Sequence, residues 1–330
     1  MTEQAPQHRT PLPAGQVNYL IATAARAPSV HNTQPWRFKA TQDAIELYAD
    51  QRRKLHMDPI GREMLISCGA ALFGLRLAIR SLGYQPIVEL FPDPAQLRLL
   101  ARAALGTAVP MTSAERALLD ALPHRHTHRG PFGPGPLPDG LIARLQHDAL
   151  AEGATLAVIQ PGLAFQRLAD IVDPAARRLD REPTARAEAS QWSRAAGSPS
   201  RDGVPAQAFA ASTAHPHGRL QQRDFDLSRG IGLLTTNGAP PAATAVLLTP
   251  GDTRADWLRA GQALHRLLAH AAVSWVFASL YTQPLEAGEI RALIRRRLAL
   301  PGSPQLLLQF GIAHTTQATP RRPPEDLVEP

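Results

Sequence analysis

The sequence has a single cysteine, Cys68, in 330 residues, so no disulfide can form within the chain. This composition fits a reducing compartment. No apolar run continues uninterrupted for about 18 residues, which argues against a membrane-spanning helix. The first 15 residues are polar and rich in proline, unlike a secretory leader. We therefore expect a cytoplasmic protein with no membrane partner.

Lysine is almost missing as well, because Lys39 and Lys54 are the only two, although the formal net charge is +7. The positive charge is carried by scattered arginines, with no nucleic-acid-binding motif or aromatic stacking platform beside them. We expect no nucleic-acid partner. No Gly-x-Gly-x-x-Gly motif follows a strand-like segment, so a dedicated dinucleotide-binding domain is not indicated. Nicotinamide chemistry at another kind of site stays open.

The most informative segment is the turn between Pro28 and Pro35, which we call the elbow. Proline fixes its own φ and disfavours helix in the residue before it, so the elbow is expected outside both helix and sheet. Ser29, Asn32 and Gln34 then offer donors and acceptors that no regular ladder uses. The elbow reads as a ligand-facing turn, although the same residue types also build turns without a ligand.

A second segment, Arg125–Arg129, has the sequence Arg-His-Thr-His-Arg and is called the basic segment here. In an extended chain His124, His126 and His128 would share a face, as metal ligands do. The interleaved arginines would repel a divalent cation but would grip a phosphate, and Thr127 adds a hydroxyl donor. We therefore favour an anion site over a metal site; a solvated basic loop is the alternative.

Hydrophobic periodicity and turn residues predict a protein with both helices and strands. The expected helices cover residues 15–27, 60–82, 112–121, 139–150, 162–180, 254–273 and 286–298, and the expected strands cover residues 45–48, 87–91, 155–159, 245–248 and 305–310. Cys68 lies on an apolar helix with no base nearby, which favours a buried thiol over a nucleophile. Trp36 either lines a ligand pocket or closes the core under the elbow.

Two long apolar helices share the pattern Gly-x-Ala-Leu-x-x-Leu, one starting at Gly69 and the other at Gly261. Each precedes a strand-like segment, which indicates an internal duplication. The halves differ in the polar segments that they carry. The elbow belongs to the first half and the basic segment to the second, so each half keeps one complementary piece.

Several motifs resemble the FMN-dependent nitroreductase superfamily, and in particular its fused, single-chain Acg-type branch. They are the elbow motif Ala-Pro-Ser-x-x-Asn-x-Gln-Pro-Trp, the run Ile66–Ala71, the basic segment, the run Trp257–Leu264 and the terminal Pro320–Pro323. The resemblance implies an α+β fold with a nitroreductase-like mixed sheet sandwiched by helices, internally duplicated as a pseudo-dimer in one chain. Residues 1–14 would be a flexible tail, 15–111 the first half, and 112–330 the second half with a lid insertion at about 181–228.

The resemblance also implies one composite FMN site, since a homodimeric relative binds FMN between subunits. Its residues would be Pro28, Ser29, Asn32 and Gln34 of the elbow, Arg125, His126, Thr127 and Arg129 of the basic segment, and Arg321 and Arg322 near the end of the chain. Only one of the last two arginines needs to reach the phosphate; alternatively both belong to a disordered tail. No catalytic side chain and no metal are expected.

By the same resemblance the chain would be a monomeric oxidoreductase. It would pass hydride from NAD(P)H through the flavin to a nitroaromatic or quinone-type acceptor. The flavin itself would carry this chemistry, so the protein would only bind and orient it. The segment 181–228 is long for a connector and would act as a lid. A lid that stays closed would make the protein an FMN-sequestering binder with little turnover.

Overall fold

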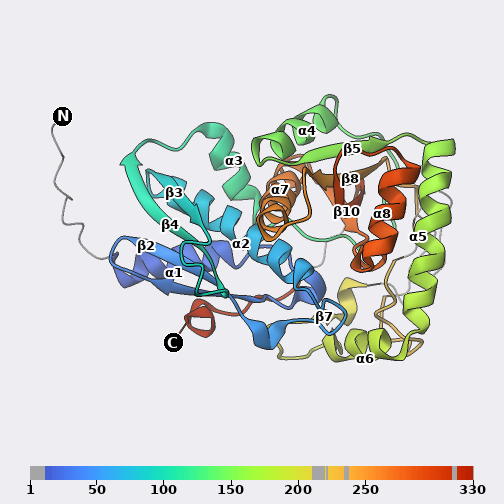
Figure 1. The fold of residues 1–330 in the computed structure, drawn as a ribbon, viewed down its shortest axis with the longest axis horizontal. Coiled ribbons are helices and arrows are strands. Elements are labelled where there is room, and N and C mark those ends of the chain that lie inside the picture. Colours follow the sequence, from blue (N-terminus) through green and yellow to red (C-terminus); the bar gives the residue numbers. More distant parts are fainter. Residues whose placement is uncertain (1–11, 210–219, 221, 234–237, 314–317, 330) are drawn as a thin grey trace.

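The structure is a computed structural model that describes residues 12–209, 220, 222–233, 238–313 and 318–329 (Figure 1). The helices are α1 (Ala14–Ala24), α2 (Arg62–Ser81), α3 (Ser113–Ala121), α4 (Leu141–Ala151), α5 (Leu163–Arg181), α6 (Pro183–Trp192), α7 (Arg254–Val273) and α8 (Gly288–Arg297). The strands are β1 (Trp36–Ala40), β2 (Ala44–Ala49), β3 (Tyr84–Leu90), β4 (Leu99–Ala108), β5 (Thr155–Ile159), β6 (Ser193–Arg194), β7 (Val204–Pro205), β8 (Ala243–Thr249), β9 (Val276–Leu280) and β10 (Ser303–Ile312). Most of the expected flexible tail lies outside the described residues, and Ala14 already begins α1.

The two halves of the chain build the same sheet twice. The first sheet has the order β1-β2-β4-β3, and the second has the order β5-β8-β10-β9. In each half the elements follow the chain as helix, strand, strand, long helix, strand and strand, apart from inserted segments in the second half. This repetition of element order and topology confirms the internally duplicated α+β fold.

The long helices α2 and α7 lie side by side at the centre, between the two sheets (Figure 1). A Cβ built on Gly261 would lie 1.9 Å from the backbone oxygen of Ile66, and one on Gly69 would lie 2.2 Å from that of Leu258. The two backbones touch at the glycines of the repeated motif. The equivalent helices of the two halves therefore form an intramolecular interface that only glycine permits.

The first sheet packs on α2, against which α1 packs in turn, and the second sheet is covered on both faces. Leu306 and Leu308 face the central core with α7, whereas Leu307 faces a second cluster formed with α5 and α8. This alternation is the period-2 pattern of a strand buried on both sides. The helix Arg62–Ser81 is long and apolar enough to span a membrane by composition, and 89% of its most apolar window is buried inside the protein.

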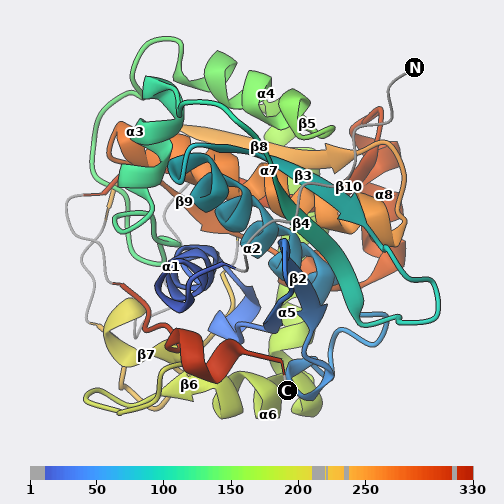
Figure 2. The same cartoon turned by 90° about the vertical axis from the view of Figure 1, so that its left-hand side faces the viewer.

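Two segments from the second half extend the edges of the sheets. The C-terminal segment runs beside α1 and forms a parallel bridge from Val328 to Phe38 of β1 (Figure 2). Thr127 of the basic segment forms a parallel bridge to Ala278 of β9. All strand pairs within the two four-stranded sheets are antiparallel. The expected duplicated mixed sheet is therefore found as two antiparallel sheets, one in each half, each with a parallel bridge at one edge.

An insertion separates β5 from β8 and carries α5, α6 and the short parallel pair β6–β7. It includes the segment 181–228 expected as a lid, of which residues 210–219 and 221 lie outside the described residues. Helices α5 and α6 run along one side and the base of the molecule in Figure 1. The insertion thereby brings residues 191–209 to the elbow of the first half.

For Cys68 and Trp36, the sequence left two roles open, and the structure shows the role in the core for each. Cys68 is buried, and burial raises the pKa of its thiol, so it is no activated nucleophile. Trp36 is fully buried in the central core.

Candidate functional site

The elbow between Pro28 and Pro35 has an unusual backbone. His31, Asn32 and Gln34 all have positive φ, at 50°, 56° and 50°. Residues other than glycine rarely adopt this left-handed backbone conformation. It costs free energy and is kept only where the surrounding structure holds it in place. The Ser29 hydroxyl contributes by accepting a hydrogen bond from the Gln34 backbone N–H at 3.0 Å. Backbone strain of this kind is typical of binding and catalytic turns.

Asn32 joins the elbow to two distant segments. Its Nδ2 donates to the carbonyl oxygens of Gly203 and Pro320, both at 3.0 Å. Its Oδ1 accepts from Nη1 of Arg321 at 3.0 Å. The side chain therefore fixes the guanidinium of Arg321 from one side and holds the insertion from the other.

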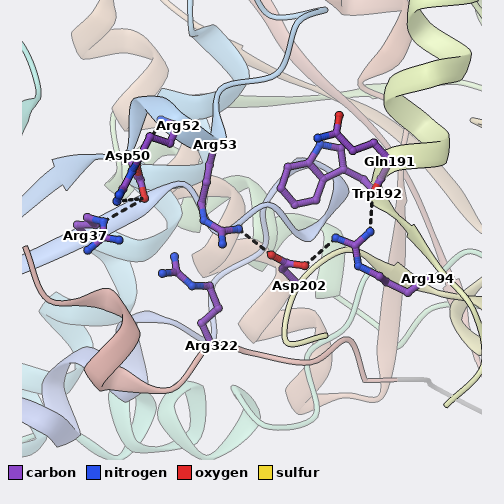
Figure 3. A pocket seen from close by; sticks show the side chains of 9 residues that line it. All are labelled: Arg37, Asp50, Arg52, Arg53, Gln191, Trp192, Arg194, Asp202 and Arg322. Carbon is purple, nitrogen blue, oxygen red and sulfur yellow. Dashed lines mark hydrogen bonds and ion pairs between the residues drawn. The ribbon is translucent and has the colours of Figure 1, made fainter. Parts of the chain in front are cut away.

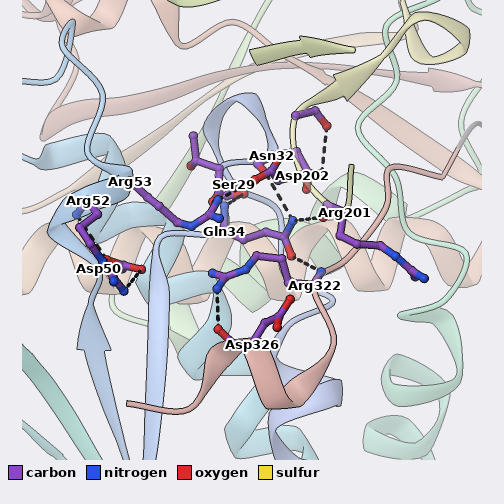
Figure 4. Close-up of polar contacts among 12 residues, drawn as sticks. Ser29, Asn32, Gln34, Asp50, Arg52, Arg53, Arg201, Asp202, Arg322 and Asp326 are labelled. Carbon is purple, nitrogen blue, oxygen red and sulfur yellow. Dashed lines mark hydrogen bonds and ion pairs between the residues drawn. The ribbon is translucent and has the colours of Figure 1, made fainter. Parts of the chain in front are cut away.

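Gln34 makes the matching connection two residues later (Figure 4). Its Nε2 donates to the carbonyl oxygen of Arg201 at 2.8 Å, and its Oε1 accepts from the backbone N–H of Arg322 at 2.8 Å. The elbow amides are therefore used to fasten three chain segments together, as buried amides require.

Three arginines from two parts of the chain, the basic segment and the C-terminal segment, lie beside the elbow; we call Arg125, Arg129 and Arg321 the arginine cluster. Arg125 Nη2 donates to the Arg26 carbonyl at 3.1 Å, and Arg321 Nη2 donates to the Ala27 carbonyl at 3.1 Å. Burial is the main reason that the pKa of Arg129 falls to about 10, and the charge of Arg129 contributes to lowering the pKa of the other two. Within the described part of the chain, no carboxylate forms an ion pair with this cluster.

The positive charge of the cluster is left uncompensated. Burial, followed by the charges of Arg321, Arg129 and Arg26, lowers the pKa of Arg125 to about 9. Among the described atoms, Nε and Nη1 of Arg125 and Nε of Arg321 are buried without a hydrogen-bond partner. Since an unpaired buried N–H costs about 1–3 kcal/mol and more on a charged group, the cluster calls for an anion. A phosphate would accept these hydrogen bonds and neutralise the charge.

Two histidines border the cluster in the neutral form. Burial and the charges of Arg125 and Arg321 lower the pKa of His126 to about 4. Burial and Arg125 lower the pKa of His265, on α7, to about 3. Nδ1 of neutral His265 lies 2.6 Å from the backbone oxygen of Ala70 and must donate to it, so its Nε2 is an acceptor. Neither histidine adds positive charge at neutral pH.

Two residues of the insertion, Arg223 and Phe225, pack against His31 of the elbow. Arg223 contacts His31 Nε2 at 2.5 Å and forms a buried ion pair with Glu286. The ring of Phe225 lies edge-on to His31, with centroids 5.3 Å apart, and the Arg129 guanidinium lies 5.7 Å above it. Burial and the charge of Arg223 hold the pKa of His31 well below its usual value. These contacts place the insertion against the arginine cluster.

Pro28, Thr127 and Arg322 were also expected at the site, and their contacts differ from those of the arginine cluster. Pro28 is buried at the start of the elbow, and the Thr127 backbone pairs with β9. The side chain of Arg322 points away from the cluster and donates to the carbonyl of Asp326. Of the two terminal arginines, Arg321 is thus the one beside Arg125.

The histidines of the basic segment do not gather around one point. The His124 ring lies 5.5 Å from that of Trp275, whereas the His128 ring lies 4.7 Å from that of Phe132. In the part of the chain that the structure describes, no three His, Cys, Asp or Glu side chains are grouped to hold a metal ion.

Sequence reasoning missed Arg26, Arg223, Phe225 and His265. Arg26 sits after an ordinary helix and His265 on an apolar one, and neither has a local signal of binding. Arg223 and Phe225 lie in the weakly patterned insertion. Arg26 is next to the elbow in the sequence, whereas the packing of α2 on α7 brings His265 close and the course of the insertion brings Arg223 and Phe225.

Comparison with known proteins gives a consistent result. Residues 8–55 match the model of the "Nitroreductase family". Over 326 residues the chain is 34% identical to "Putative NAD(P)H nitroreductase Rv3131" of Mycobacterium tuberculosis, covering 96% of this chain and 92% of that one. It is 30% identical to "Putative NAD(P)H nitroreductase acg" of the same species, covering 93% of each chain.

Among solved structures, the chain is similar to a nitroreductase with bound FMN from Bacteroides fragilis, with a TM-score of 0.36 and 8% identity, covering 61% of this chain and 93% of that one. The near-complete coverage of the curated relatives, the matching family model and the elbow motif agree. This chain belongs to the nitroreductase family.

Proposed function

We propose that the chain binds one FMN between the elbow and the arginine cluster and is a cytoplasmic oxidoreductase. It would pass hydride from NAD(P)H through the flavin to a nitroaromatic or quinone-type acceptor. The observation that carries the proposal is the set of buried, unpartnered N–H groups on Arg125 and Arg321. The names of the full-length relatives as NAD(P)H nitroreductases support the reaction class.

The residues fit a flavin phosphate. Arg125 and Arg129 come from the second half, Arg321 from the C-terminal segment, and the elbow from the first half, so the site is composite. Asn32 orients Arg321 through the 3.0 Å hydrogen bond to Nη1, and Arg125 is braced by the Arg26 carbonyl. Preset guanidiniums lose little freedom when they bind a phosphate, which strengthens binding.

FMN, when bound, supplies the hydride acceptance and donation. The protein's part is to hold, orient and shield it. The arginine cluster would anchor the phosphate end, while Pro28 and Ser29 shape the elbow around the flavin. The insertion residues Arg223 and Phe225 would exclude water from the elbow, since they already lie against His31.

A second function is favoured by one specific observation: the insertion is tightly fastened to the elbow. Gly203, Arg201 and Arg223 contact Asn32, Gln34 and His31 respectively. A lid held this firmly would give an FMN-sequestering protein with little turnover. The two functions differ in whether a nicotinamide can stack on the flavin.

Anaerobic spectroscopy separates them. For the oxidoreductase, NADH or NADPH bleaches the visible flavin band within minutes, and a nitroaromatic or a quinone restores it. For the sequestering protein, dithionite bleaches the band but neither nicotinamide does, because hydride transfer requires reacting atoms about 3–3.5 Å apart. A protein in which no reductant changes the spectrum, or which holds no flavin, contradicts both.

A variant that loosens the insertion makes the spectroscopic test more decisive. Arg223→Gln removes the ion pair to Glu286 and weakens the contact to His31. For a closed lid, this variant gains reduction by NADH that the wild type lacks. Arg186→Gln, on an exposed part of the same insertion, is the matched control and leaves the rate unchanged.

A further inference from the structure

A cavity of about 370 Å³ lies next to the elbow, since two of its lining residues, Arg53 and Arg322, donate hydrogen bonds to Thr33 and Gln34 (Figure 3). It is formed by β1 and the turn after β2, by the end of α6 and the loop before β7, and by the C-terminal segment. Five arginines line it: Arg37, Arg52, Arg53, Arg194 and Arg322. Its size is typical of small-molecule sites, and no member of the arginine cluster lines it.

Each of the two carboxylates that line this cavity already pairs with two arginines. Asp50 accepts from Arg37 at 3.0 Å and from Arg52 at 2.9 Å. In the same way, Asp202 accepts from Arg53 at 2.9 Å and from Arg194 at 2.8 Å. Each aspartate therefore balances part of the charge of two guanidiniums, and the cavity keeps a positive excess.

Arg322 has no carboxylate partner among the described residues. It is only 8% exposed, and its Nη2 donates to the Asp326 carbonyl while its Nη1 is buried without a partner. Burial and the charges of Arg53 and Arg37 lower the pKa of Arg322 to about 10. The backbone N–H of the same residue is held by Gln34. A fixed, buried guanidinium with a spare donor is a ready anchor for an oxyanion.

Trp192 adds an aromatic wall to the cavity. Its half-buried indole lies beside two guanidiniums, with the Arg194 carbon 5.6 Å and the Arg53 carbon 6.0 Å from the ring centroid. Indole rings and guanidinium planes are the surfaces on which nucleobases stack. The same cavity thus combines an oxyanion anchor with a stacking surface.

We propose that this cavity, the Trp192 pocket, binds a nucleoside phosphate, with the phosphate on Arg322 and the base against Trp192. The site is separate from the proposed flavin site and does not rest on it. The chain would therefore respond to a nucleotide at a second place, built from the first half, the insertion and the C-terminal segment together.

Calorimetric titration of the purified full-length protein, in a buffer without phosphate, tests the proposal with 5′-AMP, inorganic phosphate and adenosine. We expect 5′-AMP to bind, phosphate to bind at least about fivefold more weakly because it lacks the stacking base, and adenosine not to bind. Arg322→Gln should weaken 5′-AMP binding at least about tenfold. Trp192→Ala should reduce the affinity for 5′-AMP to that for phosphate.

Two controls protect the interpretation. Arg98→Gln removes an equal charge at a pair with Glu329 outside the pocket and should leave 5′-AMP binding unchanged. Arg322→Lys keeps the charge and should give an intermediate affinity if Arg322→Gln does not fold. Absence of binding by 5′-AMP, unchanged affinity in both Arg322 variants, or loss of FMN from Arg322→Lys would overturn the proposal.

Discussion

Replacing Gly261 by alanine probes the contact on which the duplicated fold depends. The added Cβ would lie 1.9 Å from the Ile66 oxygen and 2.7 Å from the Ala70 nitrogen, both backbone atoms. Since carbon–oxygen contacts lie at about 3.3 Å or more, α2 and α7 must move apart by about 1.4 Å. Overpacking of this kind costs up to about 3 kcal/mol. Alanine regains about 1 kcal/mol in helix propensity, which leaves a net loss of about 2 kcal/mol.

Urea unfolding followed by circular dichroism measures this loss. Gly15→Ala is the matched control, because Gly15 also lies in a helix but has open space around it. The control should be neutral or gain about 0.5 kcal/mol. The double variant with Gly69→Ala should lose less than the sum of the single losses, since both glycines relieve the same contact. A Gly261→Ala protein as stable as the wild type would refute the close packing of the two helices.

Three further predictions concern the anchor, acid stability and assembly. Arg125→Ala or Arg129→Ala should weaken FMN binding by roughly 1.5–3 kcal/mol with the fold retained, measured by flavin fluorescence; wild-type affinity in both would place the phosphate elsewhere. The hydrogen bonds from Arg80 hold the pKa of Glu115 at about 2, below its usual 4.5. This pair therefore stabilises the protein above pH 4.5, and the stability is lost as the pH falls from 4.5 towards 2. Glu115→Gln should flatten that part of the stability profile, and an unchanged profile would exclude the pair. Sedimentation should give a monomer, because α2 and α7 already cover each other; an obligate dimer would contradict this.

Local signals in the sequence predict most elements of the fold. The helix at 254–273 was expected with its observed bounds, and in the structure a capping box formed by Thr253 and Asp256 fixes its start. The strand 155–159 was also expected as observed. Strand β4 was missed because Leu99–Ala108 is rich in alanine, leucine and arginine, which favour helix, and its pairing with β2 and β3 overrides that preference.

The sequence predicts the types of residue that form the site, but not the long-range hydrogen bonds that bring them together. The prolines and the polar side chains of the elbow are local signals. The partners of Asn32 are far away in the sequence, at Gly203 and Arg321, and no local pattern reports them. The separation of Arg321 from Arg322 likewise depends on the path of the C-terminal segment, since neighbouring side chains there point to different sites.

The central proposal is one composite flavin site per chain, and the stoichiometry of released flavin tests it most directly. Acid extraction of the purified protein, followed by chromatography of the chromophore against an FMN standard, counts the cofactor for each chain. We expect one FMN per chain, because the elbow and the arginine cluster each occur once in the two halves. Two FMN per chain, a different flavin, or no flavin after saturation with FMN would contradict the composite site.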